Sequence, residues 1–275
     1  MPELPEVEHV VRALRNALAG RQIIEVQQRL KRITGTSPSS FKNRLRGARI
    51  ERVNRRGKYI LVELDGARVL LAHLRMTGKF VCLSPHQPLP PYSHIIFSLD
   101  DDRRLVFCDM RQFGRIRLLP ISKLQGSPEI RALAPEPLSD EFTVNYLRST
   151  LSRSRRTLKQ LLLDQTKIVG LGNIYAAEAL FLAGISPLKP AASLSAPRVA
   201  RLHGAIQAVL KEAIDCGSTL KIDLSDGDGN YFGSDERFWR VYEREGEPCV
   251  RCGARIWRIV HGGRSTYFCP RCQRR

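Results

Sequence analysis

Four cysteines near the C-terminal end have the spacing of a metal site. They form two C-x2-C pairs separated by sixteen residues, Cys249 with Cys252 and Cys269 with Cys272. Two thiolates two residues apart bind one side of a metal ion, and a second such pair completes a tetrahedral set of four sulfurs. Because four thiolates leave no open coordination position, the spacing predicts one structural Zn²⁺. A module of this size buries too little surface to fold without the metal.

The segment that carries these cysteines is strongly basic. Residues 249–275 contain seven arginines and no carboxylate, which predicts a metal-supported hairpin that contacts phosphate. The three remaining cysteines are expected to be buried small hydrophobes, because free thiols of this kind are usually inert core residues. They are Cys82, Cys108 and Cys216.

The N-terminal residues could supply an amine nucleophile. Removal of Met1 would leave Pro2 as a secondary amine, and an α-amine with a pKa of about 7.7–8.0 has a useful neutral fraction at pH 7. Attack of this amine on a sugar C1′ would give a cationic iminium, which is a strong electron sink. Glu3 would act as an acid only if it were desolvated or its pKa were otherwise raised. The alternative is that Pro2, Glu3 and Glu6 merely form an acidic, proline-rich helix start.

Charge and composition indicate the class of partner. The chain has 275 residues, with 45 Lys and Arg against 27 Asp and Glu, a net charge of +18. This excess favours a nucleic acid over an anionic membrane or a merely solvated basic surface. A hydrophobic content of 43% excludes a long disordered chain. The most apolar run, 168–185, contains Asn173 and Glu178, and the acidic start resembles no signal peptide, so we expect a cytoplasmic protein.

The hydrophobic period changes along the chain. Apolar residues at helical spacing predict a helix over 7–18, and a shorter period follows it. Strands are expected at 23–26, 59–64, 69–74, 94–99, 104–108 and 116–119. One helix followed by seven or eight short strands predicts a β-sandwich with a packed helix.

A proline-rich change of composition at 133–138 predicts a linker, and helical patterns follow it. Ser139 is expected to cap the first helix, and further helices are expected at 157–163, 174–182 and 197–214. Residues 217–234 read as a loop. The expected fold class is α+β, with domains at 1–134 (β-sandwich), 139–234 (helical, with the loop) and 240–274 (zinc finger).

Three ordered motifs carry a resemblance that covers the whole chain. The start, Met-Pro-Glu-Leu-Pro-Glu-Val, closely resembles that of the bacterial formamidopyrimidine-DNA glycosylases, also called 8-oxoguanine DNA glycosylases. The tail resembles the zinc finger of the same family. Between them, Asp164-Gln165 and the run Gly170 to Tyr175 resemble its helix–two-turn–helix signature. The resemblance implies a bifunctional glycosylase and AP lyase that excises oxidised purines, 8-oxoguanine and formamidopyrimidines, from duplex DNA.

The resemblance also implies catalytic roles. Pro2 would form a Schiff base with C1′ of the damaged nucleoside, and Glu3 would protonate the sugar ring oxygen. Glu6 would support the terminal amine. Lys58 would contact phosphate beside the lesion and assist β-elimination, and Arg264 would clamp phosphates and assist δ-elimination. Without the resemblance, Lys58 and Arg264 would be read as solvated basic residues.

Further residues match the DNA contacts of the family. Met76 would fill the space of the everted nucleoside, Arg111 would pair with the orphaned cytosine, and Phe113 would wedge beside it. Met76 and Phe113 precede Thr-Gly and Gly, as the tips of turns do, which favours exposure over a core position. The remaining predicted DNA contacts are His73, His94, Arg155, Lys159 and Asn173. Either histidine could instead be an ordinary strand residue, and Ser154 departs from the family lysine near Lys159.

The implied partner is damaged double-stranded DNA, bound by a monomer without a membrane, in the bacterial cytoplasm at the nucleoid. One rival is an endonuclease VIII-type enzyme for oxidised pyrimidines, which Leu4 and the wedge set Met76, Arg111 and Phe113 oppose. The other is a non-catalytic damaged-DNA-binding protein. Such a protein would be expected to have lost Pro2, Glu3 or Lys58, and all three are present.

Overall fold

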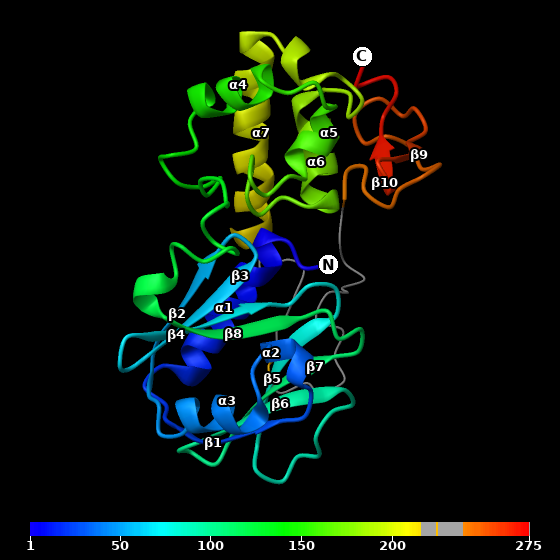
Figure 1. Cartoon of the computed structure of the whole chain (residues 1–275). Helices are drawn as coiled ribbons and strands as arrows, with labels where there is room; N and C mark the ends of the chain where they lie inside the picture. The colour runs from blue at the N-terminus through cyan, green and yellow to red at the C-terminus, as the bar shows by residue number, and fades with distance from the viewer. Residues whose placement is uncertain (216–223, 225–238, 275) are drawn as a thin grey trace. The chain divides into compact units, whose positions relative to one another are not determined.

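The computed structural model describes residues 1–215, 224 and 239–274, which fall into two compact units (Figure 1). The N-terminal unit contains residues 1–131 and Leu224, and the C-terminal unit contains 132–215 and 239–274. Cys216 and, apart from Leu224, the predicted loop at 217–234 lie outside the described residues. No helix in these described ranges is long and apolar enough to cross a membrane.

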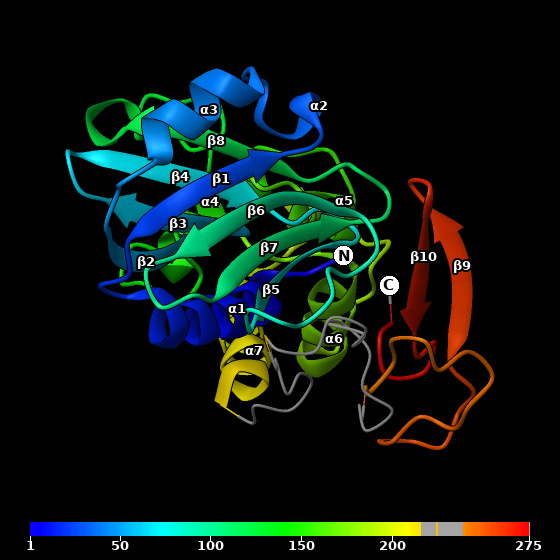
Figure 2. The ribbon, with the colours of Figure 1, turned by 90° about the horizontal axis from the view of Figure 1, so that it is seen from below.

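The N-terminal unit is a sandwich of two four-stranded antiparallel sheets, as predicted (Figure 2). One sheet has the order β1 (Ile23–Gln28), β6 (Ser93–Leu99), β7 (Arg104–Asp109) and β5 (Gly78–Leu83). The other has the order β2 (Ile50–Arg56), β3 (Tyr59–Leu64), β4 (Arg68–His73) and β8 (Arg115–Pro120). Strands β2 and β5 were not predicted. The short helices α2 (Lys31–Thr34) and α3 (Pro38–Leu45) lie between β1 and β2, and η1 (Ile121–Lys123) follows β8.

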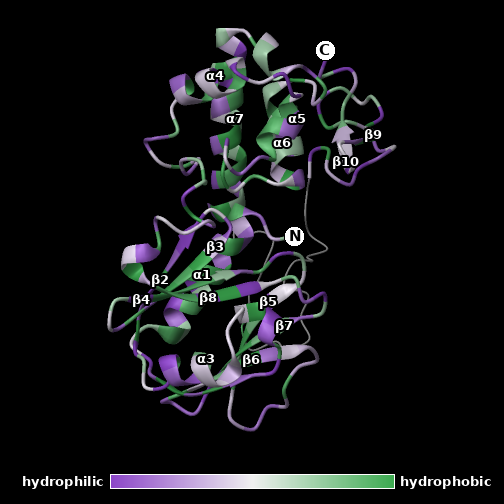
Figure 3. Ribbon diagram, viewed as in Figure 1, coloured by the Kyte–Doolittle hydropathy of each residue, from purple (hydrophilic) through white to green (hydrophobic). Residues whose placement is uncertain are grey.

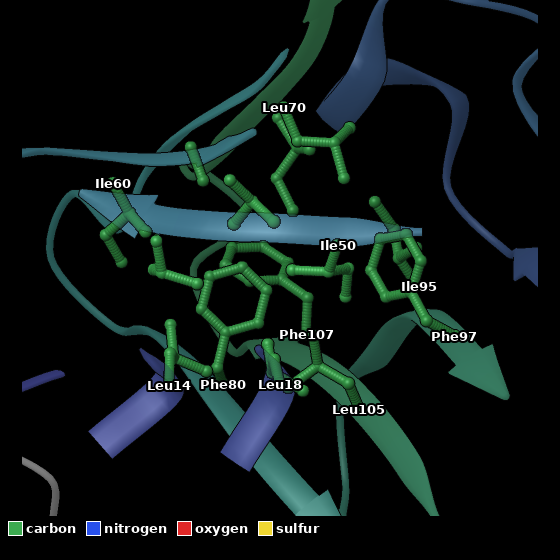
Figure 4. Close-up of a cluster of buried hydrophobic side chains, with 14 of the residues drawn as sticks. Leu14, Leu18, Ile50, Ile60, Leu70, Phe80, Ile95, Phe97, Leu105 and Phe107 are labelled. Atoms are coloured by element: carbon green, nitrogen blue, oxygen red, sulfur yellow. The ribbon is translucent and has the colours of Figure 1, made fainter. Parts of the chain in front are cut away.

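Helix α1 (Leu4–Leu18) completes the core of this unit. Its apolar stripe, predicted from the spacing, is buried, since an amphipathic helix gains most of its stability by packing one face. Leu14 and Leu18 lie beside Phe80 of β5 and Phe107 of β7 (Figure 4). The position of α1 fixes where the N-terminal residues stand relative to the sheets.

Two cysteines of this unit behave as predicted. Cys82 and Cys108 are buried in the sheet β1-β6-β7-β5. Burial raises the pKa of both thiols, because desolvation disfavours the thiolate. They therefore have the character of small hydrophobic residues rather than nucleophiles.

The C-terminal unit is helical and ends in a β-hairpin. Its helices are α4 (Val144–Ser152), α5 (Leu158–Leu162), α6 (Asn173–Ala183) and α7 (Ala196–Asp215), with a short η2 (Ala191–Ser193). Helix α6 is hydrophobic nearly all round and packs against α7 (Figure 3). The hairpin is formed by β9 (Trp257–His261) and β10 (Arg264–Phe268). The expected α+β fold with a sandwich, a helical part and a zinc-binding hairpin is confirmed.

The predicted start of the first helix in this unit is wrong. Thr143, not Ser139, caps α4, and its side chain accepts a hydrogen bond from the Tyr146 amide at 3.0 Å. Ser139 instead lies in a turn, where its backbone N–H donates to the Glu136 carbonyl. Because Phe142 is buried at 2% exposure, the chain must turn inward before the helix begins.

Candidate active site and DNA-binding residues

The N-terminal residues are held by the start of α1. Glu3 is the N-cap, and its backbone N–H donates to the Glu6 carboxylate at 2.9 Å, as part of a capping box. Pro2 is buried, and Glu3 and Glu6 are each 2% exposed. Glu6 therefore fixes the backbone that carries Pro2 and Glu3. The burial of Glu3 meets the condition of desolvation that an acid at this position requires.

An ion pair ties α1 to the hairpin that carries Lys58. Glu8 of α1 lies 2.9 Å from the Arg55 guanidinium of β2. Burial acts to raise the pKa of Glu8, but hydrogen bonds from Arg55 and Arg12 outweigh it and lower the pKa. Gly57 takes a φ of 58° in the β2–β3 turn, and Lys58 follows it at only 5% exposure. The structure thus brings the N-terminus and Lys58 to one side of the N-terminal unit.

His73, at the end of β4, is a neutral hydrogen-bond donor. Its Nδ1 accepts the Arg75 N–H at 2.9 Å, and its ring lies edge-on to Tyr59 with centroids 4.7 Å apart. Burial, with the nearby charges of Arg75 and Lys58, lowers the pKa of His73 to about 3. The proton of the neutral ring is therefore on Nε2, which suits donation to a phosphate oxygen.

This environment predicts a pH dependence of stability. The His73 pKa is about 3 in the folded protein, against an ordinary value of 6.5, so between these limits the unfolded chain binds more protons. The contribution of neutral His73 to the free energy of unfolding is complete above pH 6.5. It decreases as the pH falls, by up to about 1.4 kcal/mol per pH unit. Urea unfolding should be measured from pH 7.5 to 5. The difference in the free energy of unfolding between the wild type and His73→Gln should become smaller as the pH falls. The exposed His86→Gln variant should follow the wild type, and a parallel His73→Gln curve would contradict this account.

His73 and Tyr59 line a cationic pocket of about 440 Å³ in the same unit. The arginines in its wall are Arg32, Arg75, Arg115 and Arg117. Glu129 pairs with Arg117, so the positive charges of the four arginines exceed the negative charge in the pocket wall by three. The pocket is suited to the phosphates of a polyanion.

The predicted wedge residues lie in two turns of the N-terminal unit. Met76 and Phe113 are 40% and 48% exposed, although large apolar side chains are usually buried. Arg111 is also exposed, and its guanidinium carbon lies 5.0 Å from the centre of the Phe113 ring. The expected exposure of Met76 and Phe113 is confirmed.

The four predicted metal ligands converge in the C-terminal unit. Their sulfur atoms all lie within 4.8 Å of one another, with Cys249 and Cys272 3.9 Å apart and Cys252 and Cys269 3.5 Å apart. A tetrahedral zinc with Zn–S bonds near 2.3 Å requires separations of about 3.8 Å. The Arg251 amide also donates to the Cys249 sulfur at 3.4 Å, as zinc knuckles do. The donor set fits one structural zinc.

The helices of this unit hold the hairpin that presents Arg264. Gly262 and Gly263 both take positive φ values, 58° and 72°, in a two-residue turn, and the exposed Arg264 follows. Next to it, the Ser265 carbonyl accepts hydrogen bonds from Lys159 at 2.8 Å and from Asn173 at 3.0 Å. The position of the Arg264 backbone is thereby set from α5 and α6.

The structure corrects the predicted DNA contact at Lys159. Its side chain is 1% exposed, and its ammonium also donates to the Thr266 hydroxyl at 2.8 Å. A buried cation engaged by two oxygens of β10 is not available to phosphate. Lys159 is an internal support of the hairpin.

The other predicted DNA contacts differ in how they are placed. Arg155 is exposed, and Asn173 stands at the first residue of α6. His94 is buried, and its Nε2 lies 2.9 Å from the Asp109 carbonyl.

One buried carboxylate of the C-terminal unit was missed. Glu178 of α6 is 1% exposed and accepts the amide N–H groups of Arg240, Val241 and Tyr242 at 2.9–3.1 Å. It fixes the start of the chain that leads to the zinc cysteines. The only signal in the sequence is a single glutamate within an apolar run.

Comparisons with known proteins agree with this fold and site. Family models match the formamidopyrimidine-DNA glycosylase N-terminal domain at residues 1–116 and its H2TH domain at 133–223. A third, the zinc finger found in FPG and IleRS, matches 246–275. These are the domains of a DNA glycosylase of the helix–two-turn–helix type.

The relatives identify the family. The formamidopyrimidine-DNA glycosylase of Pelotomaculum thermopropionicum is 46% identical over 275 residues, covering 100% of this chain and 99% of that protein. That of Heliobacterium modesticaldum is 44% identical, with 100% of both chains covered. The solved structure of the Lactococcus lactis Fpg with abasic-site DNA has a TM-score of 0.91 at 35% identity, covering 99% and 100%. The chain belongs to the formamidopyrimidine-DNA glycosylase family, whose members are glycosylases with AP lyase activity.

Proposed function

We propose that this chain excises oxidised purines, 8-oxoguanine and formamidopyrimidines, from duplex DNA and then cuts the strand at the resulting site. The observation that carries the proposal is the capped N-terminus, in which the buried Glu3 and Glu6 fix the backbone that follows Pro2. The Glu8–Arg55 ion pair joins the same helix to the hairpin of Lys58. A DNA complex of the Lactococcus lactis Fpg with FAPY-dG supports the choice of oxidised purines.

The chemistry begins at the amine of Pro2, once Met1 is removed. The amine attacks C1′, the N-glycosidic bond breaks, and the damaged base leaves with the bonding electron pair and takes up a proton. Glu3 protonates the sugar ring oxygen, which opens the ring and leaves an iminium between Pro2 and C1′. The iminium draws electrons from the C2′–H bond, so loss of that proton expels the 3′ phosphate in β-elimination.

Basic residues complete the strand cleavage. Lys58 binds the phosphate beside the lesion, and Arg264 binds the phosphate that leaves in the second, δ-elimination. Hydrolysis of the iminium then frees Pro2. The zinc takes no part in these steps, because its four thiolates leave it without an open position and its function is to support the Arg264 hairpin.

Damaged duplex DNA is the partner in this proposal. Its backbone meets His73, His94, Arg155, Asn173 and Arg264, and its opened base pair meets Met76, Arg111 and Phe113. The protein acts as a monomer in the cytoplasm, at the nucleoid, without a membrane. The net charge of +18 supports a strong contribution of phosphate neutralisation to binding.

Two lesions distinguish this function from its nearest rival. Excision should be measured under single-turnover conditions on matched duplexes that carry 8-oxoguanine opposite cytosine or thymine glycol opposite adenine. We expect the first to be processed faster, with β,δ-elimination products. Faster removal of thymine glycol would assign the chain to an endonuclease VIII-type activity, and tight binding without excision of either would leave a damage-binding protein.

A further inference from the structure

A buried carboxylate at the end of β7 takes no part in the proposed chemistry. Asp109 is 1% exposed, although a buried carboxylate is costly unless its oxygens are hydrogen-bonded. Its Oδ1 accepts the Thr77 hydroxyl, and its Oδ2 accepts the Gly114 N–H at 2.7 Å. These two donors belong to different turns, residues 74–78 and 110–114, which we call the wedge loops because they carry Met76 in one case and Arg111 and Phe113 in the other.

Thr77 joins the wedge loops a second time. While its hydroxyl donates to Asp109, the same oxygen accepts the Arg111 N–H at 3.1 Å. The Asp109 carbonyl accepts the Gln112 N–H at 3.2 Å and lies 2.9 Å from Nε2 of His94. One hydroxyl and one carboxylate thus fix the backbone N–H groups of Arg111 and Gly114, the two ends of the segment that carries Phe113.

The wedge loops are also closed tightly over one aromatic ring. A Cβ at Gly78 would lie 2.4 Å from the Leu74 carbonyl oxygen and 3.0 Å from the Phe107 ring. A Cβ at Gly114 would lie 2.6 Å from the same ring and 3.0 Å from Oδ2 of Asp109. Since no side chain fits at either glycine, each loop packs against the Phe107 ring with backbone alone at the point of contact.

We propose that Asp109 and Thr77 are positioning residues that hold the two wedge loops in one fixed relation, so that the three wedge side chains enter the duplex together. The assignment rests on the proposed function, because only an enzyme that opens a base pair needs this insertion. We call these hydrogen bonds of Asp109 and Thr77 the lock. Because the lock is formed before DNA binds, it removes the free-energy cost of ordering two loops during insertion.

A matched pair of substitutions at Thr77 tests the lock. Thr77→Val keeps the shape of the side chain but leaves Asp109 and the Arg111 N–H each without one partner, whereas Thr77→Ser keeps the hydroxyl. We expect Thr77→Val to slow single-turnover excision of 8-oxoguanine from a duplex by about ten-fold or more, and Thr77→Ser to remain within about two-fold of wild type.

Two further measurements separate positioning from general damage. Cleavage of an abasic site in a single-stranded oligonucleotide should be equal in wild type and both variants, because no base pair has to be opened. The fluorescence rise of a 2-aminopurine placed beside a stable abasic analogue in a duplex should be smaller with Thr77→Val. Asp109→Asn, which replaces one acceptor by a donor, should repeat the selective loss and covers the case in which Thr77→Val does not fold.

Several results would overturn the assignment. Duplex excision by Thr77→Val at the wild-type rate would do so, as would an equal loss in duplex and single-strand cleavage together with a lower melting temperature. A wild-type protein that cleaves single-stranded abasic sites but excises no 8-oxoguanine from duplex DNA would refute the proposed function itself, and the lock with it. A selective duplex defect rescued by serine supports the lock.

Discussion

The variant Glu3→Gln is expected to excise 8-oxoguanine about 10²- to 10⁴-fold more slowly than wild type, the range that a general acid contributes. The amide cannot give a proton to the sugar ring oxygen, although it can accept the same hydrogen bond in the capping box of α1. Cleavage of a preformed abasic site should fall much less, because its sugar is already in equilibrium with the open aldehyde. Single-turnover gel assays on the two substrates measure both effects.

Glu51→Gln is the matched control for this variant. Glu51 is exposed on β2, so its substitution removes one carboxylate from the same unit without touching the N-terminus. It should excise at the wild-type rate. If Glu3→Gln did the same, the assignment of Glu3 as the acid would be wrong.

Loss of one zinc ligand is expected to unfold the hairpin that carries Arg264. Structural zinc contributes about 10–16 kcal/mol in small modules, as much as the whole stability of a typical domain. In Cys269→Ser the zinc content should fall from one ion per chain to near zero. Strand cleavage should then stop after β-elimination, because Arg264 is no longer held by the contacts of Ser265 with Lys159 and Asn173.

Cys82→Ala is the control, since Cys82 is also buried but lies in the N-terminal unit, apart from the four-cysteine cluster. It should keep one zinc per chain and both elimination steps. Amide hydrogen exchange should show loss of protection in β9 and β10 of Cys269→Ser while the sandwich stays protected. A zinc-free Cys269→Ser protein that completes δ-elimination would contradict the role of the hairpin.

Much of the fold could be predicted because its signals are local. The spacing of the zinc cysteines and the period of α1 depend only on near neighbours, and the alternation in Tyr59–Leu64 matches β3 residue for residue. Strand β2 was missed because a register shift between Ile50 and Arg52 interrupts the alternation, and most of its other residues are polar. Its identity as a strand depends on pairing with β3.

The site was predictable only where a motif carried it. Lys159 has the charge of a phosphate ligand, and its correct role depends on Ser265, 106 residues away. Asp109 and Glu178 are single carboxylates, and each accepts backbone N–H groups, which have no signature in the sequence. Buried polar residues of this kind are determined by tertiary contacts, and they support the residues that the motifs identify.

The Glu6 contact explains how the residues of the N-terminal motif depend on one another for their positions. Glu6 fixes the Glu3 amide, which in turn sets the backbone next to Pro2. The Glu8–Arg55 ion pair then relates this backbone to the Lys58 hairpin. The residues that we propose as nucleophile, acid and phosphate ligand are thus positioned by one helix start and one adjacent turn.

The central claim is that the amine of Pro2 attacks the damaged nucleotide, and covalent trapping tests it directly. The protein, with Met1 shown by mass spectrometry to be removed, is mixed with an 8-oxoguanine duplex and borohydride, which reduces an iminium to a stable amine. We predict a protein–DNA adduct whose modified peptide begins with Pro2. A version with two extra N-terminal residues, which turn this amine into an amide, should give none, while the same extension at the C-terminus should have no effect. An adduct of equal yield on the N-terminally extended protein, or one mapped to Lys58, would contradict the account.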